Sequence, residues 1–153
     1  SRSSRGVSSR GMNLISKYIM TLDFLSSLSK KKGYCIYDGS RTLRSSTDNV
    51  PDAPGVYIIS DHNGVIIYIG KAGTIRQDGS FKSQGLHGRL NNKQKDIARQ
   101  EYFDSRMSAE SIPQIRIDWY ELNEGIIPGY IEGLLIQEYY HANKVLPRWN
   151  ESF

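Results

Sequence analysis

Two runs of β-branched and aromatic residues, 56–59 and 65–69, flank an Asn63-Gly64 dipeptide. Asn-Gly between two such runs is a strong hairpin signal, because both residues tolerate positive φ angles. The pattern therefore predicts two adjacent antiparallel strands. Pairing across this turn would bring Tyr57 and Tyr68 into one neighbourhood, where their hydroxyls could serve a phosphate or each other.

The later part of the chain predicts one more strand and further helices. Residues 115–120 alternate between apolar and polar side chains, as a strand should, and residues 86–102 are typical of a helix. Pro128 is well placed as the first residue of a helix that reaches about Asn143. We therefore expect an α/β fold in which a central three-stranded antiparallel sheet is flanked by two or three helices.

The first third of the chain predicts a helical appendage. Residues 14–28 carry apolar side chains at helical spacing, so they indicate a helix that covers a sheet face. The run of lysines at 30–32 is typical of a solvated helix end, because cations favour helix C-termini and Gly33 follows as a stop signal. Residues 40–52 are polar and turn-rich, which indicates a connecting segment.

These patterns divide the chain into three parts. Residues 1–11 are rich in serine, arginine and glycine, which is typical of a disordered arm or an expression remnant. Residues 12–53 are expected to hold the N-terminal helix and the connecting segment. Residues 54–153 are expected to form the main domain.

Length and composition fit one hydrophobic core and no disulfide. The chain has 153 residues, 38% of them hydrophobic, and a single cysteine. The neighbours of Cys35 suggest a half-buried strand, so we expect an inert core thiol. No apolar run approaches the roughly eighteen residues of a membrane span, and no secretion leader is visible. We therefore expect an intracellular protein, cytoplasmic or nucleoid-associated.

Positive charge gathers in the first two-thirds of the chain. The formal net charge is +4, and 17 of the 20 Lys and Arg residues precede position 107, against nine of the 16 acidic residues. A basic region of this kind suits a polyanion, because each phosphate that it neutralises releases counterions. The charge pattern therefore favours a nucleic acid as partner.

The order of the motifs resembles the GIY-YIG nuclease family, with Val56 in place of the usual isoleucine. The residues that carry the resemblance are Gly55-Val56-Tyr57, Tyr68-Ile69-Gly70-Lys71, Gly-Leu-His-Gly-Arg-Leu at 85–90, Glu132 before an apolar run, and Leu146-Pro147-Arg148-Trp149-Asn150. In that family an arginine opens the first helix, a glutamate lies on a later helix and an asparagine closes the domain. Arg89, Glu132 and Asn150 occupy those places, and the resemblance runs from about Pro54 to Asn150.

Two glutamates compete for the family's metal-binding position. Glu138 lies twelve residues before Asn150, a separation seen in some family members, whereas Glu132 lies eighteen before it. Only Glu132 has hydrophobic residues at the next three and four positions, as the family pattern has, so we choose Glu132. From the residues alone, a carboxylate on an apolar stripe could instead reach solvent or an arginine.

A single glutamate implies a sparse magnesium site. Mg²⁺ prefers six oxygen ligands and keeps several waters, so one carboxylate and a substrate phosphate oxygen can hold it, and Mn²⁺ is a plausible substitute. Metal binding should then be weak until DNA arrives. The three histidines are scattered and no Walker loop is present, so a zinc enzyme and a P-loop enzyme are disfavoured.

The resemblance and the chemistry of phosphodiester hydrolysis imply a role for each site residue. Tyr57 would be the base toward the attacking water, with Lys71 lowering its pKa, and Tyr68 would orient phosphate or water. The other roles are Arg89 at the non-bridging oxygens, Glu132 at the metal, Asn150 holding the backbone, and His87 as a phosphate contact or rival base. Candidate DNA contacts are Lys71, Arg76, Lys82, Arg89 and Lys93.

The sequence therefore predicts a Mg²⁺-dependent endonuclease domain that leaves 5′-phosphate and 3′-hydroxyl ends, as the family implies, with duplex DNA as its partner. Two alternatives stay open: a nucleic-acid-binding module of the same fold that cuts nothing, and a structure-specific or RNA-directed nuclease. The sequence gives no recognition code and no oligomeric state.

Overall fold

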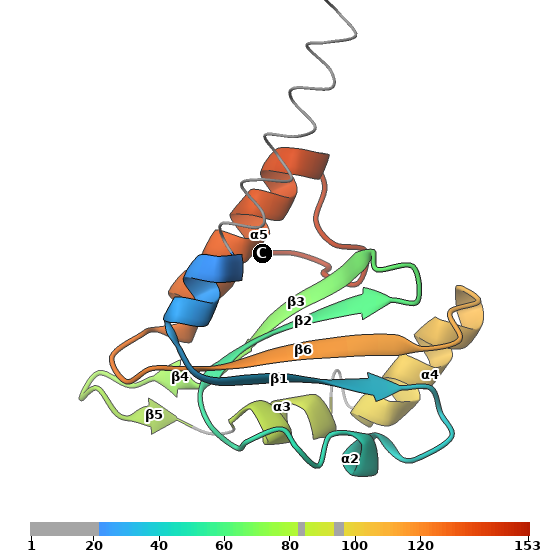
Figure 1. Cartoon of the computed structure of the whole chain (residues 1–153), viewed down its shortest axis with the longest axis horizontal. Coiled ribbons are helices and arrows are strands. Elements are labelled where there is room, and N and C mark those ends of the chain that lie inside the picture. The colour runs from blue at the N-terminus through green and yellow to red at the C-terminus, as the bar shows by residue number, and fades with distance from the viewer. Residues whose placement is uncertain (1–21, 83–84, 94–96) are drawn as a thin grey trace, which may run out of the picture.

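A computed structural model describes residues 22–82, 85–93 and 97–153. Its centre is a four-stranded antiparallel sheet in the order β1-β6-β2-β3 (Figure 1). The strands are β1 (Ser29–Tyr37), β2 (Gly55–Asp61), β3 (Ile66–Ala72) and β6 (Ile115–Leu122). The antiparallel α/β fold is confirmed, but the prediction of three strands is wrong, because β1 adds a fourth. The predicted arm at 1–11 and the start of the predicted helix at 14–28 lie outside the described residues.

The fourth strand comes from the lysine-rich segment that we assigned to a helix end. β1 pairs with β6 along its length, and its buried Cys35 and Tyr37 alternate with exposed Tyr34 and Ile36. Gly33 lies opposite Trp119, and a Cβ on Gly33 would approach the indole Cζ2 to 2.6 Å. The glycine that we took for a helix stop is therefore required by cross-strand packing. Lysines on an edge strand also discourage edge-to-edge association.

The predicted hairpin is confirmed between β2 and β3. The Asp61 amide donates to the Val65 carbonyl, and the Gly64 amide donates back to Asp61. The Asp61 carboxylate accepts from the Asn63 and Val65 amides, which fixes the turn. Only Gly64 of the Asn-Gly pair has a positive φ, at 80°. A bulge between Ile59 and Ser60 shifts the register near the turn.

Helices cover both faces of the sheet, as Figure 1 shows. One face carries α5 (Pro128–Asn143) and the helical residues 22–27, and the other carries α2 (Leu43–Ser46), α3 (Leu86–Asn91) and α4 (Arg99–Ala109). Successive side chains of β2 point to opposite faces of the sheet, so they contribute to two different hydrophobic cores. Tyr57 and Ile59 join the core that contains Phe103, whereas Val56 and Ile58 join the core of α5.

The helix predicted over 86–102 is wrong as a single element. α3 ends at Asn91, because Asn92 takes an extended backbone conformation with ψ 171°, and α4 begins only at Arg99. The polar run after Leu90 offers no apolar stripe that would hold a continuous helix against the sheet. The predicted helix from Pro128 to Asn143 is confirmed, with Pro128 in its first turn and Lys144 as a left-handed cap.

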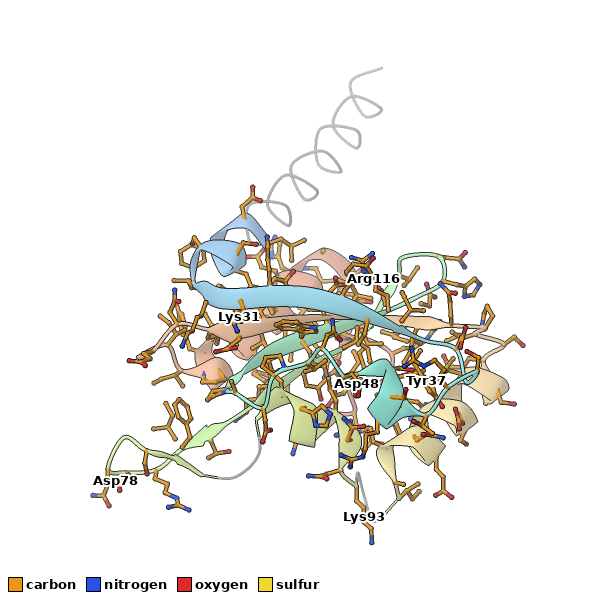
Figure 2. The ribbon with its side chains drawn as sticks, turned by 60° about the horizontal axis from the view of Figure 1, so that its bottom comes forward. Lys31, Tyr37, Asp48, Asp78, Lys93 and Arg116 are labelled. Carbon is orange, nitrogen blue, oxygen red and sulfur yellow. The ribbon has the colours of Figure 1, made fainter. Side chains whose placement is uncertain are left out.

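A second, two-stranded sheet pairs β4 (Thr74–Ile75) with β5 (Phe81–Lys82) and projects from the body of the domain (Figures 1 and 2). The sequence analysis predicted no strands here. Among the described helices, none is both long and apolar enough to cross a membrane.

We predict that Gly55→Ala destabilises the fold by about 3 kcal/mol, the upper end of the usual overpacking cost. A Cβ at this position would collide with the Tyr120 carbonyl oxygen, and this backbone atom belongs to the β2–β6 ladder. The measurement is the free energy of unfolding in urea. Gly133→Ala is the control: its Cβ would meet the Phe153 ring at 3.5 Å, an ordinary contact, so we expect a gain of roughly 0.5–1 kcal/mol. A Gly55→Ala protein as stable as the wild type would contradict the strand packing described above.

Candidate active site

The aromatic rings of Tyr57 and Tyr68 meet over a glycine. Tyr57 lies opposite Gly70 in the β2–β3 register, and the two tyrosine ring centroids are 5.8 Å apart. A Cβ on Gly70 would lie 2.6 Å from the Tyr57 hydroxyl oxygen and 2.8 Å from Tyr68 Cε1. The glycine of the second motif therefore makes room for both phenols, and the hairpin brings them together as its pairing predicted.

Tyr57 is fully buried, and its hydroxyl lies beside the Tyr68 phenol. Burial, followed by the neighbouring phenol of Tyr68, raises the pKa of Tyr57 well above its ordinary value. The positive charges of Arg99 and then Arg89 lower this pKa and so offset part of the burial effect.

The expectation that Lys71 lowers the pKa of Tyr57 is wrong in this structure. Lys71 lies opposite Val56 in the strand register, and Val56 belongs to the α5-side core. The Lys71 Nζ lies 3.8 Å from the point that a Cβ on Gly129 of α5 would occupy. The ammonium is therefore on the other face of the sheet from the phenol.

Glu132 lies one turn beyond Gly129 on α5 and is half-buried. Burial raises the pKa of its carboxyl, and the positive charges of Lys71 and then Arg89 lower it. Glu138 lies six positions later, which is roughly 240° around the helix, so it projects from a different side. Among the two rival glutamates, Glu132 is the one that the structure brings to Lys71 and Arg89.

Arg89 comes from α3, whose start is held against the segment before β2. The Asp52 carboxylate accepts hydrogen bonds from the Gly85 and Gly88 amides at 3.1 and 3.3 Å. Arg89 is exposed, yet its charge acts on both Tyr57 and Glu132. Its half-buried neighbour His87 donates from its backbone amide to the Pro51 carbonyl.

Asn150 holds the edge of β3 through both ends of its side-chain amide. Its Oδ1 accepts from the Ile69 amide at 3.0 Å, and its Nδ2 donates to the Ile69 carbonyl at 2.9 Å. The Trp149 amide donates to the Ile67 carbonyl at 2.8 Å. Because Ile69 lies between Tyr68 and Gly70, Asn150 fixes the backbone of the second motif, which is the contact that its expected role requires.

Arg99 is the residue of this region that the sequence analysis missed. It is 2% exposed, opens α4 and lies over the Phe103 ring at 5.9 Å. We had placed it in the interior of one long helix and gave it no role. The available signal was its position: Arg99, Phe103 and Met107 recur every four residues, so an arginine occupies the buried stripe of a helix.

The parts of the candidate site therefore lie around β3, the edge strand of the sheet. The two tyrosines lie on one face, Lys71 and Glu132 lie on the other, and Arg89 acts electrostatically on both sides. The described residues include no group of three or more His, Cys, Asp or Glu side chains that could hold a metal ion. The half-buried Glu132 carboxylate offers oxygen ligands of the kind that divalent magnesium prefers.

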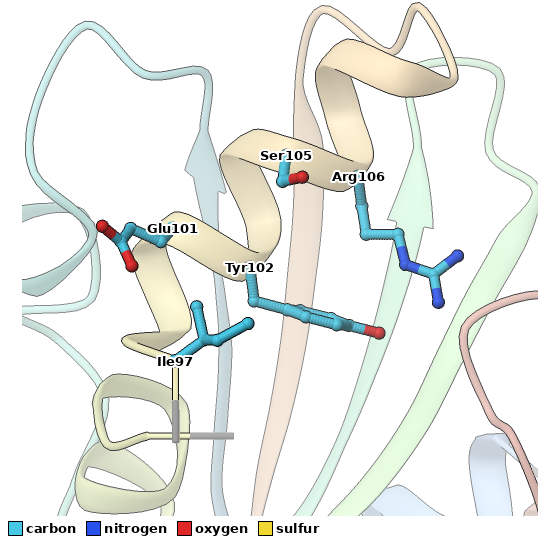
Figure 3. Close-up of a pocket in the computed structure, with 5 residues that line it drawn as sticks. All are labelled: Ile97, Glu101, Tyr102, Ser105 and Arg106. Carbon is cyan, nitrogen blue, oxygen red and sulfur yellow. The ribbon is translucent and has the colours of Figure 1, made fainter. Parts of the chain in front are cut away.

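Of the other predicted DNA contacts, Arg76 and Lys93 are exposed. Arg76 lies at the tip of the β4–β5 sheet, Lys82 lies in β5, and the exposed Lys93 follows α3 (Figure 2). A separate depression on α4 is lined by Ile97, Glu101, Tyr102, Ser105 and Arg106 (Figure 3). Arg106 lies over the Tyr102 ring at 5.6 Å, and the Tyr102 ring meets the Trp149 ring edge-on at a centroid distance of 6.1 Å.

Short stretches of the chain are similar to three proteins named UvrABC system protein C. The relative from Moorella thermoacetica is 44% identical over 45 residues, which is 29% of this chain and 7% of the relative. Those from Caldicellulosiruptor saccharolyticus and Dictyoglomus thermophilum are 49% and 46% identical over 35 residues, 23% of this chain and 6% of each relative. These matches span a small part of the relatives. No protein-family profile and no solved structure matches the chain.

We predict that Asn150→Ala opens the edge of β3. The substitution leaves the Ile69 amide and carbonyl unpaired, so the fold should lose about 1–3 kcal/mol and the Ile69 amide should exchange its hydrogen faster. Hydrogen exchange followed by NMR measures this. Asn143→Ala removes one exposed hydrogen bond to Tyr139 and serves as the control, with little expected change. An unaltered exchange rate of the Ile69 amide in the Asn150 variant would show that Asn150 does not hold the edge of β3.

Proposed function

We propose that this chain is a Mg²⁺-dependent DNA endonuclease of the GIY-YIG type. The observation that carries the proposal is the arrangement around Arg89, whose charge acts on the buried Tyr57 phenol beside Tyr68 and on the half-buried Glu132 carboxylate beside Lys71. The partial similarity to UvrABC system protein C supports the proposal. The order of the motifs along the chain supports the assignment to the GIY-YIG type.

The chemistry follows from what hydrolysis of a phosphodiester requires. A water must lose a proton, the phosphorus must carry extra negative charge, and the leaving oxygen must be stabilised. Tyr57 takes the proton of the attacking water, and Tyr68 orients the water or the phosphate. Arg89 faces the non-bridging oxygens, for which a planar guanidinium is well suited. The products carry 5′-phosphate and 3′-hydroxyl ends.

Glu132 would hold the metal together with oxygens of the bound substrate. When bound, Mg²⁺ supplies positive charge at the phosphate and the leaving oxygen. The charges of Lys71 and Arg89 oppose the effect of burial on the pKa of Glu132, because they favour its deprotonated form. Mn²⁺ has the same preference for oxygen ligands and should replace Mg²⁺.

A substrate panel tests the proposed activity. Plasmid, linear duplex, branched DNA, single-stranded DNA and RNA are incubated with the full chain, with Mg²⁺, Mn²⁺ or EDTA. We expect cleavage of duplex DNA only with a divalent ion, and we expect a DNA ligase to reseal the products without prior kinase treatment. Binding of DNA without any cleavage would favour a nucleic-acid-binding module that cuts nothing. Cleavage of branched DNA or RNA alone would favour a structure-specific or RNA-directed nuclease.

We predict that Glu132→Ala lowers the cleavage rate by about 10²-fold or more, whereas duplex binding changes little. Affinity arises from many phosphate contacts, but the chemistry depends on one carboxylate. Single-turnover cleavage and a binding titration in Ca²⁺ measure the two effects. Glu138→Ala is the matched control on the same helix. Loss of cleavage in the Glu138 variant, with normal cleavage in the Glu132 variant, would reverse the assignment.

The base is tested by the pH dependence of single-turnover cleavage. Because burial raises the pKa of Tyr57, only a small fraction of the phenol is ionised at neutral pH, so the rate should keep rising with pH through 7–9. Tyr57→Phe should lose about 10²-fold or more in rate and should lose this rise. Arg99→Met removes a charge that lowers the pKa, so its rate at any pH on the rising limb should fall, and Arg99→Lys should restore part of it.

His87→Ala is the competing test of the base. A profile that keeps its rise in Tyr57→Phe but becomes flat in His87→Ala would transfer the role to the histidine.

A further inference from the structure

The β4–β5 sheet, which we call the ribbon (residues 74–82), does not pair with the main sheet. Its two strands pair only with each other, through Thr74 with Lys82 and Ile75 with Phe81. Figures 1 and 2 show that it projects away from the domain, with Asp78 at its far end. A two-stranded sheet of this length is too short to be stable alone, and it adds no layer to the core. It begins three residues after Lys71, beside the candidate site.

The tip of the ribbon is held in one conformation by its own hydrogen bonds. The Arg76 amide donates to the Ser80 carbonyl at 2.7 Å, and the Gly79 amide donates to the Arg76 carbonyl at 2.9 Å. Gly79 has φ 85°, which a glycine adopts without strain. The Asp78 carboxylate accepts from the Ser80 hydroxyl and amide, and these bonds lower the pKa of Asp78. The one acidic side chain of the ribbon is therefore bonded within the turn itself.

The base of the ribbon is packed against the main sheet. A Cβ on Gly73 would approach the Pro54 Cβ to 2.9 Å and the Phe81 Cδ1 to 3.3 Å. Phe81 and Pro54 therefore close around Gly73, and Pro54 directly precedes β2. This contact fixes the direction of the ribbon relative to the strands that carry Tyr57 and Lys71.

The side chains at the tip are of the kind that bind base edges. Arg76, Gln77 and Asp78 line an open depression there, and Arg76 and Gln77 are exposed. Arginine pairs with the O6 and N7 acceptors of guanine, and glutamine pairs with the N6 and N7 groups of adenine. The major groove of duplex DNA is wide enough to admit a two-stranded β-ribbon.

We propose that the ribbon enters the major groove of duplex DNA beside the cleaved phosphate, where Arg76 and Gln77 contact base edges and set the preferred cleavage sequence. This inference rests on the proposed nuclease function. It assigns sequence preference to the ribbon, whereas Arg89, Lys71 and Glu132 act on the phosphate whatever the sequence.

The test compares cleavage sites in a library of random duplexes. Sequencing of the products of the wild-type chain gives its preferred site, and the ratio of cleavage at that site to cleavage elsewhere is then measured for variants. Arg76→Ala should lower this ratio by about 5- to 150-fold, the range that one bidentate base contact provides. Lys31→Ala removes an exposed charge on β1, at the opposite edge of the main sheet from β3, and should leave the ratio unchanged. An equal ratio in Arg76→Ala and wild type, or a wild-type chain that cuts without any preference, would overturn the inference.

A base analogue tests the groove itself. Replacing the guanines of the preferred site one at a time by 7-deazaguanine removes the N7 acceptor from the major groove and leaves base pairing intact. At one position the wild type should lose cleavage, and Arg76→Ala should be insensitive at that same position. Wild-type and Arg76→Ala chains that respond alike at every position would show that Arg76 does not read N7.

The two proposals fail in different ways. If the wild type cleaves none of the substrates, the nuclease proposal fails, and the ribbon is then tested by protection of guanine N7 from dimethyl sulfate on bound duplex. If the wild type cleaves DNA but Arg76→Ala shows the same preference and the same N7 protection, only the ribbon inference fails.

Discussion

The edge of a β-sheet presents unpaired N–H and C=O groups, and this protein closes the β3 edge mainly with one side-chain amide. Asn150 both donates to and accepts from Ile69, so it takes the place that a neighbouring strand would occupy. Trp149 adds a backbone bond to Ile67, and its ring stacks on Phe103 at 5.9 Å. In the described part of the chain no further strand pairs with β3, so the edge near Lys71 can be approached from outside the sheet.

Burial and nearby positive charge have opposing effects on a pKa on each face of the sheet. Burial raises the pKa of Tyr57 on one face and of Glu132 on the other, and arginine or lysine charges lower both. Arg89 contributes to each, although the two groups belong to different layers. The Arg89 guanidinium therefore links the pKa of the Tyr57 phenol to the pKa of the Glu132 carboxyl, and an anion that neutralises Arg89 would raise both pKa values.

The sequence predicted the elements whose own pattern was strong. The Asn-Gly hairpin, the alternating strand from Ile115 and the helix that begins at Pro128 all have local signals, and all are present. β1 was missed because its lysines and Gly33 match a helix end locally, whereas their true reason is pairing with β6. The spacing of Arg99, Phe103 and Met107 indicates a buried arginine, but its effect on Tyr57 could not be predicted, because it depends on where α4 begins and on how α4 packs.

The Asn150–Ile69 contact joins residues 81 positions apart, and this separation orders the folding of the site in time. During synthesis the hairpin with Tyr57 and Tyr68 emerges long before the residue that closes its edge. Contacts of high sequence separation form slowly, because a long loop must be closed first. Tyr57 and Tyr68 should therefore lie for a time on a hairpin whose β3 edge is still open, until Asn150 pairs with Ile69.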